Sequence, residues 1–416
     1  MSAYLRNFFL VLCLLALFQN AAFGQPNDNP LLEYSYSGAG KLGASGHEFM
    51  SVMAHKEVQK VLLDVANEPR KAAYLDEKLK GTGVTSDDLQ KLRLIRREGD
   101  KYVLAFSLFT NADLDKIRAV AEVEGKSLAA ALLVRRSEIE NILARNPQLG
   151  VDWKARAFIV LGCASLDWDG LDFVRKKGYL TVPEKGTYLP VAYQIGGGGS
   201  LRGIYKGSHN FHETIALTTF GDHYSLPRNS LNEIFDLIGQ MQGPESIRIR
   251  LYDATFALVR RRAGMMMLSL REGEKTFEQL AEASGITDVE ARALINLLLE
   301  LNYISTVDGR YRALIPVFNE GDEPMVRERR RLGRDVMVKW FDEHYVALSK
   351  QFSDLAPARC GVPLAEGFYE VWHYIFGLAN KELVAAGLFA DPYDDSRIFK
   401  GFIPTVYILN VLKGSI

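Results

Sequence analysis

The stretch Thr276–Phe318, TFEQLAEASGITDVEARALINLLLELNYISTVDGRYRALIPVF, decides the fold. It opens on Thr276, with Gln279 three positions later, and the same spacing recurs at Thr287 and Glu290. Ser or Thr followed three residues later by Glu or Gln is a capping box, in which two side chains satisfy backbone N–H groups at a helix start. The stretch therefore predicts two consecutive helices.

The remainder of this stretch predicts a helix end and a β-hairpin. Gly285 lies where the first helix should end, because glycine readily adopts the left-handed conformation found just after helices. In Asp288–Leu301, apolar residues including Val289 and Ala293 fall on one stripe at helical spacing, so we expect that stripe to face a core. Ile304–Val307 and Tyr311–Phe318 then flank an Asp-Gly pair, which is typical of a tight hairpin turn.

An earlier part of the chain shows the same pattern. Lys56–Leu92 predicts short helices, and Leu94–Phe109 predicts a hairpin about Gly99-Asp100. The copies keep a spacing of 209 residues at four pairs: Leu92 and Leu301, Ile95 and Ile304, Tyr102 and Tyr311, Phe109 and Phe318. Such self-similarity indicates duplication, although two unrelated copies of one fold would also share these core residue types. Helical stretches are expected after both hairpins, at Ala112–Ala144 and Pro324–Phe352.

Both copies resemble the winged helix-turn-helix superfamily, loosely its ArsR-like and MarR-like regulators. The resemblance implies that a recognition helix, Ser86–Leu92 or Asp288–Leu301, and a wing, Glu98–Lys101 or Val307–Arg310, contact DNA. For a DNA-binding regulator, the candidate contact residues are Lys91, Arg93, Arg96, Arg97, Arg292 and Arg310. The resemblance also implies that the helices after each wing form the seam of a homodimer; the alternative is that they pack within the chain.

The charge of the chain gives DNA binding little support. Lys and Arg number 50 against 51 Asp and Glu, which excludes a strongly basic nucleic-acid-binding protein. Phosphate contacts by Lys and Arg dominate DNA affinity, but residues 287–302 contain three acidic residues and only Arg292. Residues 85–97, with four basic and two acidic side chains, suit DNA better. We interpret Arg260–Arg262 and the arginines of Arg327–Arg334 as solvated helix faces.

The N-terminus predicts export. Met1–Gly24 has a basic Arg6, the apolar run Phe8–Phe18 and small residues before Gln25, as a cleaved signal peptide requires. The run is shorter than the roughly 20 residues that span a bilayer, which argues against an uncleaved anchor, and we expect no membrane span in the mature chain. A periplasmic or secreted protein does not meet chromosomal DNA. The cysteines that remain, Cys163 and Cys360, either form one disulfide or are two buried thiols.

The middle of the chain holds the candidate ligand sites. His209, His212 and His223 lie close together and could bind zinc, although Ala216 breaks the H-E-x-x-H pattern of zinc proteases. Hydrogen-bonded loop histidines without any cofactor are the alternative. His223 also lies with Arg228 just before a helix expected at Leu231–Met241, where an anion would be stabilised. The glycines of Gly38–Gly43 and Gly196–Ser200 lack the flanking elements of nucleotide-binding loops.

These patterns predict an α+β fold in which two winged-helix-like repeats flank a small mixed insert, closed by an aromatic C-terminal helix at Glu366–Gly387. We expect strands at Ala157–Leu161 and Phe402–Leu412. The expected segments are a signal peptide (1–24), a linker (25–46), repeat 1 with trailing helices (47–150), the insert (151–245), repeat 2 with a trailing helix (246–352) and a C-terminal helical segment (353–416).

The function expected from the sequence is that of an exported, non-enzymatic protein that binds a protein or a small molecule. The alternatives are a DNA-binding regulator whose N-terminal segment is unused or serves as an anchor, and a metal-dependent hydrolase that uses the three histidines of the insert.

Overall fold

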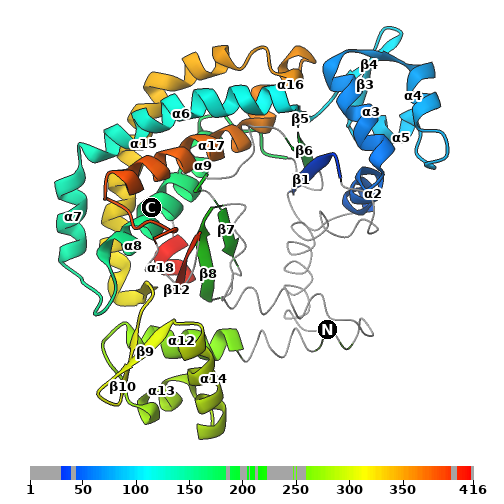
Figure 1. Cartoon of the computed structure of the whole chain (residues 1–416). Coiled ribbons are helices and arrows are strands. Elements are labelled where there is room, and N and C mark those ends of the chain that lie inside the picture. The colour runs from blue at the N-terminus through cyan, green and yellow to red at the C-terminus, as the bar shows by residue number, and fades with distance from the viewer. Residues whose placement is uncertain are drawn as a thin grey trace. The chain divides into compact units, whose positions relative to one another are not determined.

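The computed structural model describes residues 30–38, 44–183, 188–196, 204–205, 207–210, 214–222, 247, 250, 259–394 and 401–413. The described residues form two compact units (Figure 1). Unit 1 draws on Met1–Ala121, Leu171–Ser200 and Asp342–Trp372, and unit 2 on Glu122–Gly170, Leu201–Phe341 and His373–Ile416. Helices and strands both contribute, so the predicted α+β class is confirmed. The expected signal peptide lies outside the described residues.

Unit 1 contains a first helix–hairpin segment, residues 56–104. Its elements are α3 (Lys56–Asn67), β2 (Arg70–Lys71), α4 (Ala72–Lys78), α5 (Ser86–Lys91), β3 (Ile95–Glu98) and β4 (Lys101–Leu104). The side chains of Thr85 and Asp88 form a capping box at the start of α5. The hairpin β3–β4 turns about Gly99, whose φ of 63° suits glycine, and β2 pairs with β4 on the other edge.

Unit 2 contains a second helix–hairpin segment, residues 261–313. Its elements are α12 (Arg261–Leu270), α13 (Phe277–Ser284), α14 (Asp288–Glu300), β9 (Ile304–Val307) and β10 (Arg310–Ala313). Both capping boxes predicted here are confirmed, at Thr276 with Gln279 and at Thr287 with Glu290. Gly285 ends α13 in the left-handed conformation, with a φ of 61°, as its position predicted.

Each unit also has a larger sheet. In unit 1 the order is β1 (Leu32–Gly38), β6 (Tyr188–Gln194), β5 (Ser107–Phe109). In unit 2 it is β11 (Val317–Phe318), β12 (Phe402–Ile408), β8 (Ile215–Gly221), β7 (Gly207–Asn210). Both central ladders, β1–β6 and β8–β12, are antiparallel, and each pairs every residue of its seven-residue strands in register. The short strand that follows each hairpin, β5 or β11, pairs in parallel with the middle strand.

Individual backbone hydrogen bonds recur at the spacing of 209 residues. Leu94 N donates to Leu89 O, and Tyr303 N donates to Leu298 O, both at 2.9 Å. Arg93 and Asn302, also 209 apart, follow these helices with φ values of 58° and 55°. The same register returns far downstream in the chain, where three further pairs of bonds match: Lys177 N to Phe173 O with Ala386 N to Glu382 O, Gly178 N to Arg175 O with Gly387 N to Val384 O, and Tyr179 N to Val174 O with Leu388 N to Leu383 O.

The remaining helices are α2 (Ala44–Met53), α6 (Asn111–Leu133), α7 (Arg136–Ala144), α8 (Trp153–Ala157), the π-helix η1 (Phe158–Asp169), α9 (Gly170–Lys176), the 3-10 helix η3 (Glu320–Asp322), α15 (Glu323–Gln351), α16 (Ala356–Arg359), α17 (Leu364–Ala385) and α18 (Leu409–Lys413). The aromatic helix predicted at the C-terminus is confirmed as α17. The strand predicted at Ala157–Leu161 is wrong, because these residues lie in α8 and η1. Phe402–Leu412 is a strand only as far as Ile408.

The buried residues explain the error at Ala157–Leu161. Ten consecutive residues of η1, from Phe158 to Asp167, are buried, so this helix is apolar on every face and its sequence lacks helical periodicity. Cys163 lies within this run. Its thiol and that of Cys360 are both free and buried, so the two cysteines do not form a disulfide.

Candidate functional site

A buried carboxylate, Asp322, gathers two arginines inside unit 2. Arg156 Nη2 donates to Asp322 Oδ1 at 2.6 Å, and Arg271 donates to both carboxylate oxygens, through Nη2 at 2.7 Å and Nε at 2.8 Å. Asn146 Nδ2 adds a fourth hydrogen bond at 2.8 Å. The local sequence places the acid: Asn319 and Asp322 form a capping box that starts η3, and α15 continues from it.

Helix ends place the two arginines. Arg271 is the C-cap of α12. Arg156 lies on α8, whose N-cap Asp152 accepts a hydrogen bond from Lys154 N at 2.9 Å. Burial lowers the pKa of Arg156 to about 10, because the charged guanidinium is removed from water; the nearby Asp322 opposes this shift.

A third arginine, Arg329 on α15, is fully buried without a carboxylate partner among the described residues. Its Nη2 donates to the backbone oxygen of Ile139 on α7 at 3.2 Å, but its Nε and Nη1 have no hydrogen-bond acceptor. Burial and the positive charge of Arg156 hold the pKa of Arg329 well below its ordinary value. Arg156, Arg271 and Arg329 thus bring three cations to one carboxylate.

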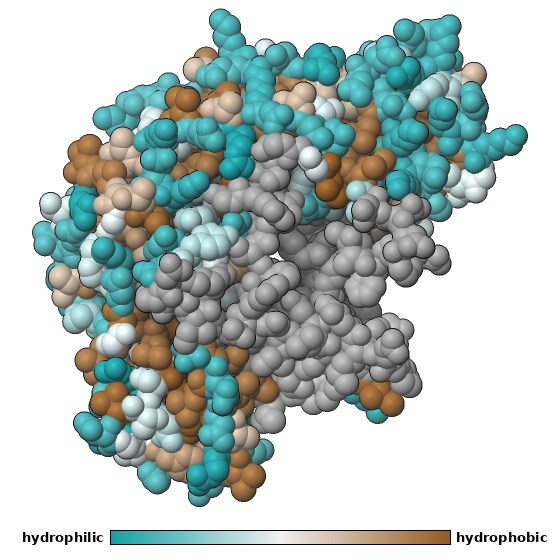
Figure 2. Space-filling view, in the orientation of Figure 1, coloured by the Kyte–Doolittle hydropathy of each residue, from teal (hydrophilic) through white to brown (hydrophobic). Residues whose placement is uncertain are grey.

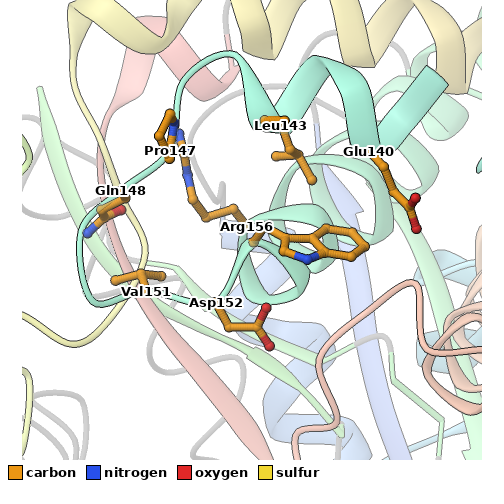
Figure 3. A pocket seen from close by; sticks show the side chains of 9 residues that line it. Glu140, Leu143, Pro147, Gln148, Val151, Asp152 and Arg156 are labelled. Atoms are coloured by element: carbon orange, nitrogen blue, oxygen red, sulfur yellow. The ribbon is translucent and has the colours of Figure 1, made fainter. Parts of the chain in front are cut away.

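A pocket of about 460 Å³ adjoins this cluster between α7 and α8. Figure 3 shows Leu143, Pro147, Val151 and Arg156 around it, with Glu140 on the neighbouring turn of α7. The half-buried Trp153 also lines the pocket. Apolar walls with a few polar groups are typical of small-molecule sites.

The polar residues of this pocket, other than Arg156, are engaged within the chain. Glu140 accepts from Arg136 Nε at 2.7 Å, and Asp152 caps α8. Gln148 donates to Ile315 O at 3.0 Å and accepts from Val317 N at 2.9 Å, which fixes the loop between α7 and α8 beside β11. Arg156 is therefore the cationic side chain among the residues that line the pocket.

The residues predicted to contact DNA belong to both units and make local contacts. In unit 1, Lys91 pairs with Glu48 at 3.1 Å, Arg96 binds the backbone oxygen of Cys360, and Arg97 Nε donates to Gly99 O at 3.0 Å, while Arg93 is exposed. In unit 2, Arg292 lies 4.9 Å above the ring of Phe277, and Arg310 Nη2 donates to Glu274 O at 3.2 Å.

The predicted zinc and anion residues mostly lie outside the described part of the chain. This holds for His212, His223 and Arg228, and for the side chain of His209, which is on β7. Among the described residues, no group of three or more His, Cys, Asp or Glu side chains is arranged to hold a metal ion.

The sequence-based interpretation missed the buried arginines. We expected Arg327–Arg334 to be a solvated face, but Arg329 and Arg330 are buried, and Arg330 Nε donates to Asp169 at 2.8 Å. Arg260 is also buried rather than exposed. The available signal was helical spacing: Arg329 is three residues after the buried Val326 and three before the buried Leu332, so it shares their face of α15.

Comparisons with protein-family models, with curated proteins and with solved structures find no match. Within the part of the chain that the structure describes, no helix combines the length and apolar character needed to cross a membrane.

Proposed function

We propose that this chain is an exported, non-enzymatic binding protein built from two copies of a winged-helix-like module, and that the second module contacts a protein rather than DNA. The segments taken as modules are the two helix–hairpin segments, residues 56–104 and 261–313. Each has three helices followed by an antiparallel hairpin, which is the element order of the superfamily that the sequence resembles.

Duplication is supported by the recurrence of backbone geometry. Hydrogen bonds match at 209 residues both at the end of the third helix of each segment and far beyond the hairpins, near Tyr179 and Leu388. Asp113 and Asp322, also 209 apart, are buried and each accepts a hydrogen bond from the backbone N–H three residues earlier, Thr110 or Asn319. Two unrelated segments would share core residue types, but they have no reason to keep one spacing over so long a stretch.

The surface of α14, the counterpart of a recognition helix, is the observation that carries the proposal against DNA. Val289 is 80% exposed and Ala293 is exposed, so part of the stripe that we expected to face the core faces solvent instead. Asp288 and Glu300 are exposed on the same helix. An acidic and partly apolar surface repels phosphate, whereas it suits a protein partner.

The hydropathy of the surface differs between the two modules. Over α4, α5 and the β3–β4 hairpin the visible surface is mostly hydrophilic, whereas over α12–α14 hydrophobic and hydrophilic residues are mixed (Figure 2). The first module therefore keeps the better case for the alternative, a DNA-binding regulator, through the exposed Lys91, Arg93 and Arg97.

DNA binding by the purified mature chain separates these functions. Fluorescence anisotropy with a labelled duplex of mixed sequence, at low and at physiological salt, should show no saturable binding. Binding that weakens steeply with salt, and that is lost in Arg93→Ser with Arg97→Ser but retained in Arg331→Ser, would establish the regulator instead. Arg331 is a matched control because it is an exposed arginine outside both modules.

A further inference from the structure

The arginine cluster of unit 2 is not a requirement of the fold. Asp113 and Asp322 occupy the same capping position at the start of α6 and α15, and Val120 and Arg329 each lie seven residues further on. The first copy thus has a half-buried valine where the second has a fully buried arginine. A charge that one copy does without must have another reason in the other copy.

The buried cations are incompletely satisfied. Asp322 is the only carboxylate hydrogen-bonded to Arg156 or Arg271 among the described residues, and none is bonded to Arg329. Arg329 Nε and Nη1 and Arg156 Nε are buried and have no acceptor. Burying a charge or a donor without a partner is costly, so such groups are normally paired. An anion beside them would offset the cost.

The pocket gives an anion a route to these groups. Arg156 lines it, and Arg329 is bonded to Ile139 on α7, the helix that also contributes Leu143 to the pocket wall. The remaining walls include Pro147, Val151 and Trp153, which offer apolar surface to the rest of a ligand.

We propose that this pocket of unit 2 binds a small organic anion, with a carboxylate or phosphate group against Arg156 and an apolar body against Leu143, Pro147 and Trp153. The charge of Arg329 behind Arg156 strengthens the attraction without having to touch the ligand. This inference rests on the proposed binding function and names its ligand class.

The test uses the purified mature chain and three probes of similar size: phenylacetate, phenyl phosphate and the uncharged 2-phenylethanol. Isothermal titration and thermal unfolding should show binding and a raised melting temperature with at least one of the two anions, and neither effect with the alcohol. Binding of only one anion identifies the group as carboxylate or phosphate.

Two variants locate the site. Arg329→Met should weaken binding of the anion about tenfold or more, while the melting temperature without ligand stays the same or rises, because an unpaired buried charge is removed. Arg331→Met, which removes an exposed arginine from the same helix, should change neither property. Trp153→Ala, which removes part of the apolar wall and leaves the cations in place, should also weaken binding and serves if Arg329→Met fails to fold.

Equal binding of the alcohol and the anions, no binding of any probe, or unchanged affinity in both Arg329→Met and Trp153→Ala would overturn the proposal. None of these outcomes affects the DNA-binding result, so failure of this site is distinguishable from failure of the proposed function.

Discussion

The carboxylate of Asp322 and the guanidinium of Arg156 meet at 2.6 Å with both side chains almost completely buried. Asp113, at the equivalent position in the first copy, is buried as well, but its carboxylate accepts hydrogen bonds from the backbone N–H groups of Thr110 and Ala356. The same acid therefore neutralises arginines in one unit and caps backbone in the other.

This difference predicts unequal costs of removing the two charges. Asp322→Asn should lower the free energy of unfolding by about 3–5 kcal/mol, since it leaves buried guanidinium groups without their counterion. Asp113→Asn should cost about 1–3 kcal/mol, the range for losing hydrogen bonds of a buried group. Urea unfolding measures both, with the exposed Asp335→Asn as a control expected to stay within about 0.5 kcal/mol. Equal losses at Asp322 and Asp113 would contradict the charge pairing.

Close packing of α15 against η1 in unit 2 predicts a steric effect. A Cβ built on Gly333 would lie 2.2 Å from Ser165 Oγ and 3.0 Å from Ser165 Cβ. Gly333→Ala should therefore destabilise the protein by about 1–3 kcal/mol, as overpacked cores do. Adding Ser165→Gly removes both clashing atoms and should recover part of the loss, which a double-mutant cycle measures. Simple additivity of the two substitutions would show that these helices do not pack as described.

The composition of the units predicts how a nicked chain behaves. Unit 1 includes Asp342–Trp372 and unit 2 includes Glu122–Gly170, so each unit contains residues from both sides of Gly196–Ser200. After cleavage at a protease sequence inserted in that glycine-rich stretch, the two fragments should stay together on native size exclusion and separate only in denaturant. Fragments that separate under native conditions would indicate two sequential, independent domains.

Burial predicts that both cysteines are inert in the folded protein. Burial raises the pKa of the Cys163 thiol well above its ordinary value, with a smaller contribution from Asp167, and burial also raises the pKa of Cys360. The thiolate is the reactive form, so a thiol reagent at pH 8 should leave the native mature chain unmodified and should modify both cysteines in urea. Rapid modification of the native protein would place at least one thiol at the surface.

The sequence predicted the local elements well where they depend on local chemistry. The capping boxes at Thr276 and Thr287 and the left-handed Gly285 are in place, because each depends on residues within one helical turn. The apolar run Ala157–Leu161 was misassigned because a helix buried on all sides and a buried strand have the same composition.

The candidate site was not predictable in the same way. Arg156, Arg271 and Asp322 are far apart in the chain, and tertiary folding alone brings them together. A run of arginines in a helical sequence suggests a solvated face, and the burial of Arg329 becomes visible only when its spacing from Val326 and Leu332 is considered. The predicted exposure of the arginines and burial of Val289 were therefore both wrong, for the same reason: which face of a helix meets the core is set by its partners.

Cell fractionation with N-terminal sequencing tests the central claim most directly. The account predicts that the chain is recovered outside the cytosol and begins at Gln25, after removal of Met1–Gly24. A chain that keeps Met1, remains in the cytosol and is recovered on chromosomal DNA would contradict it.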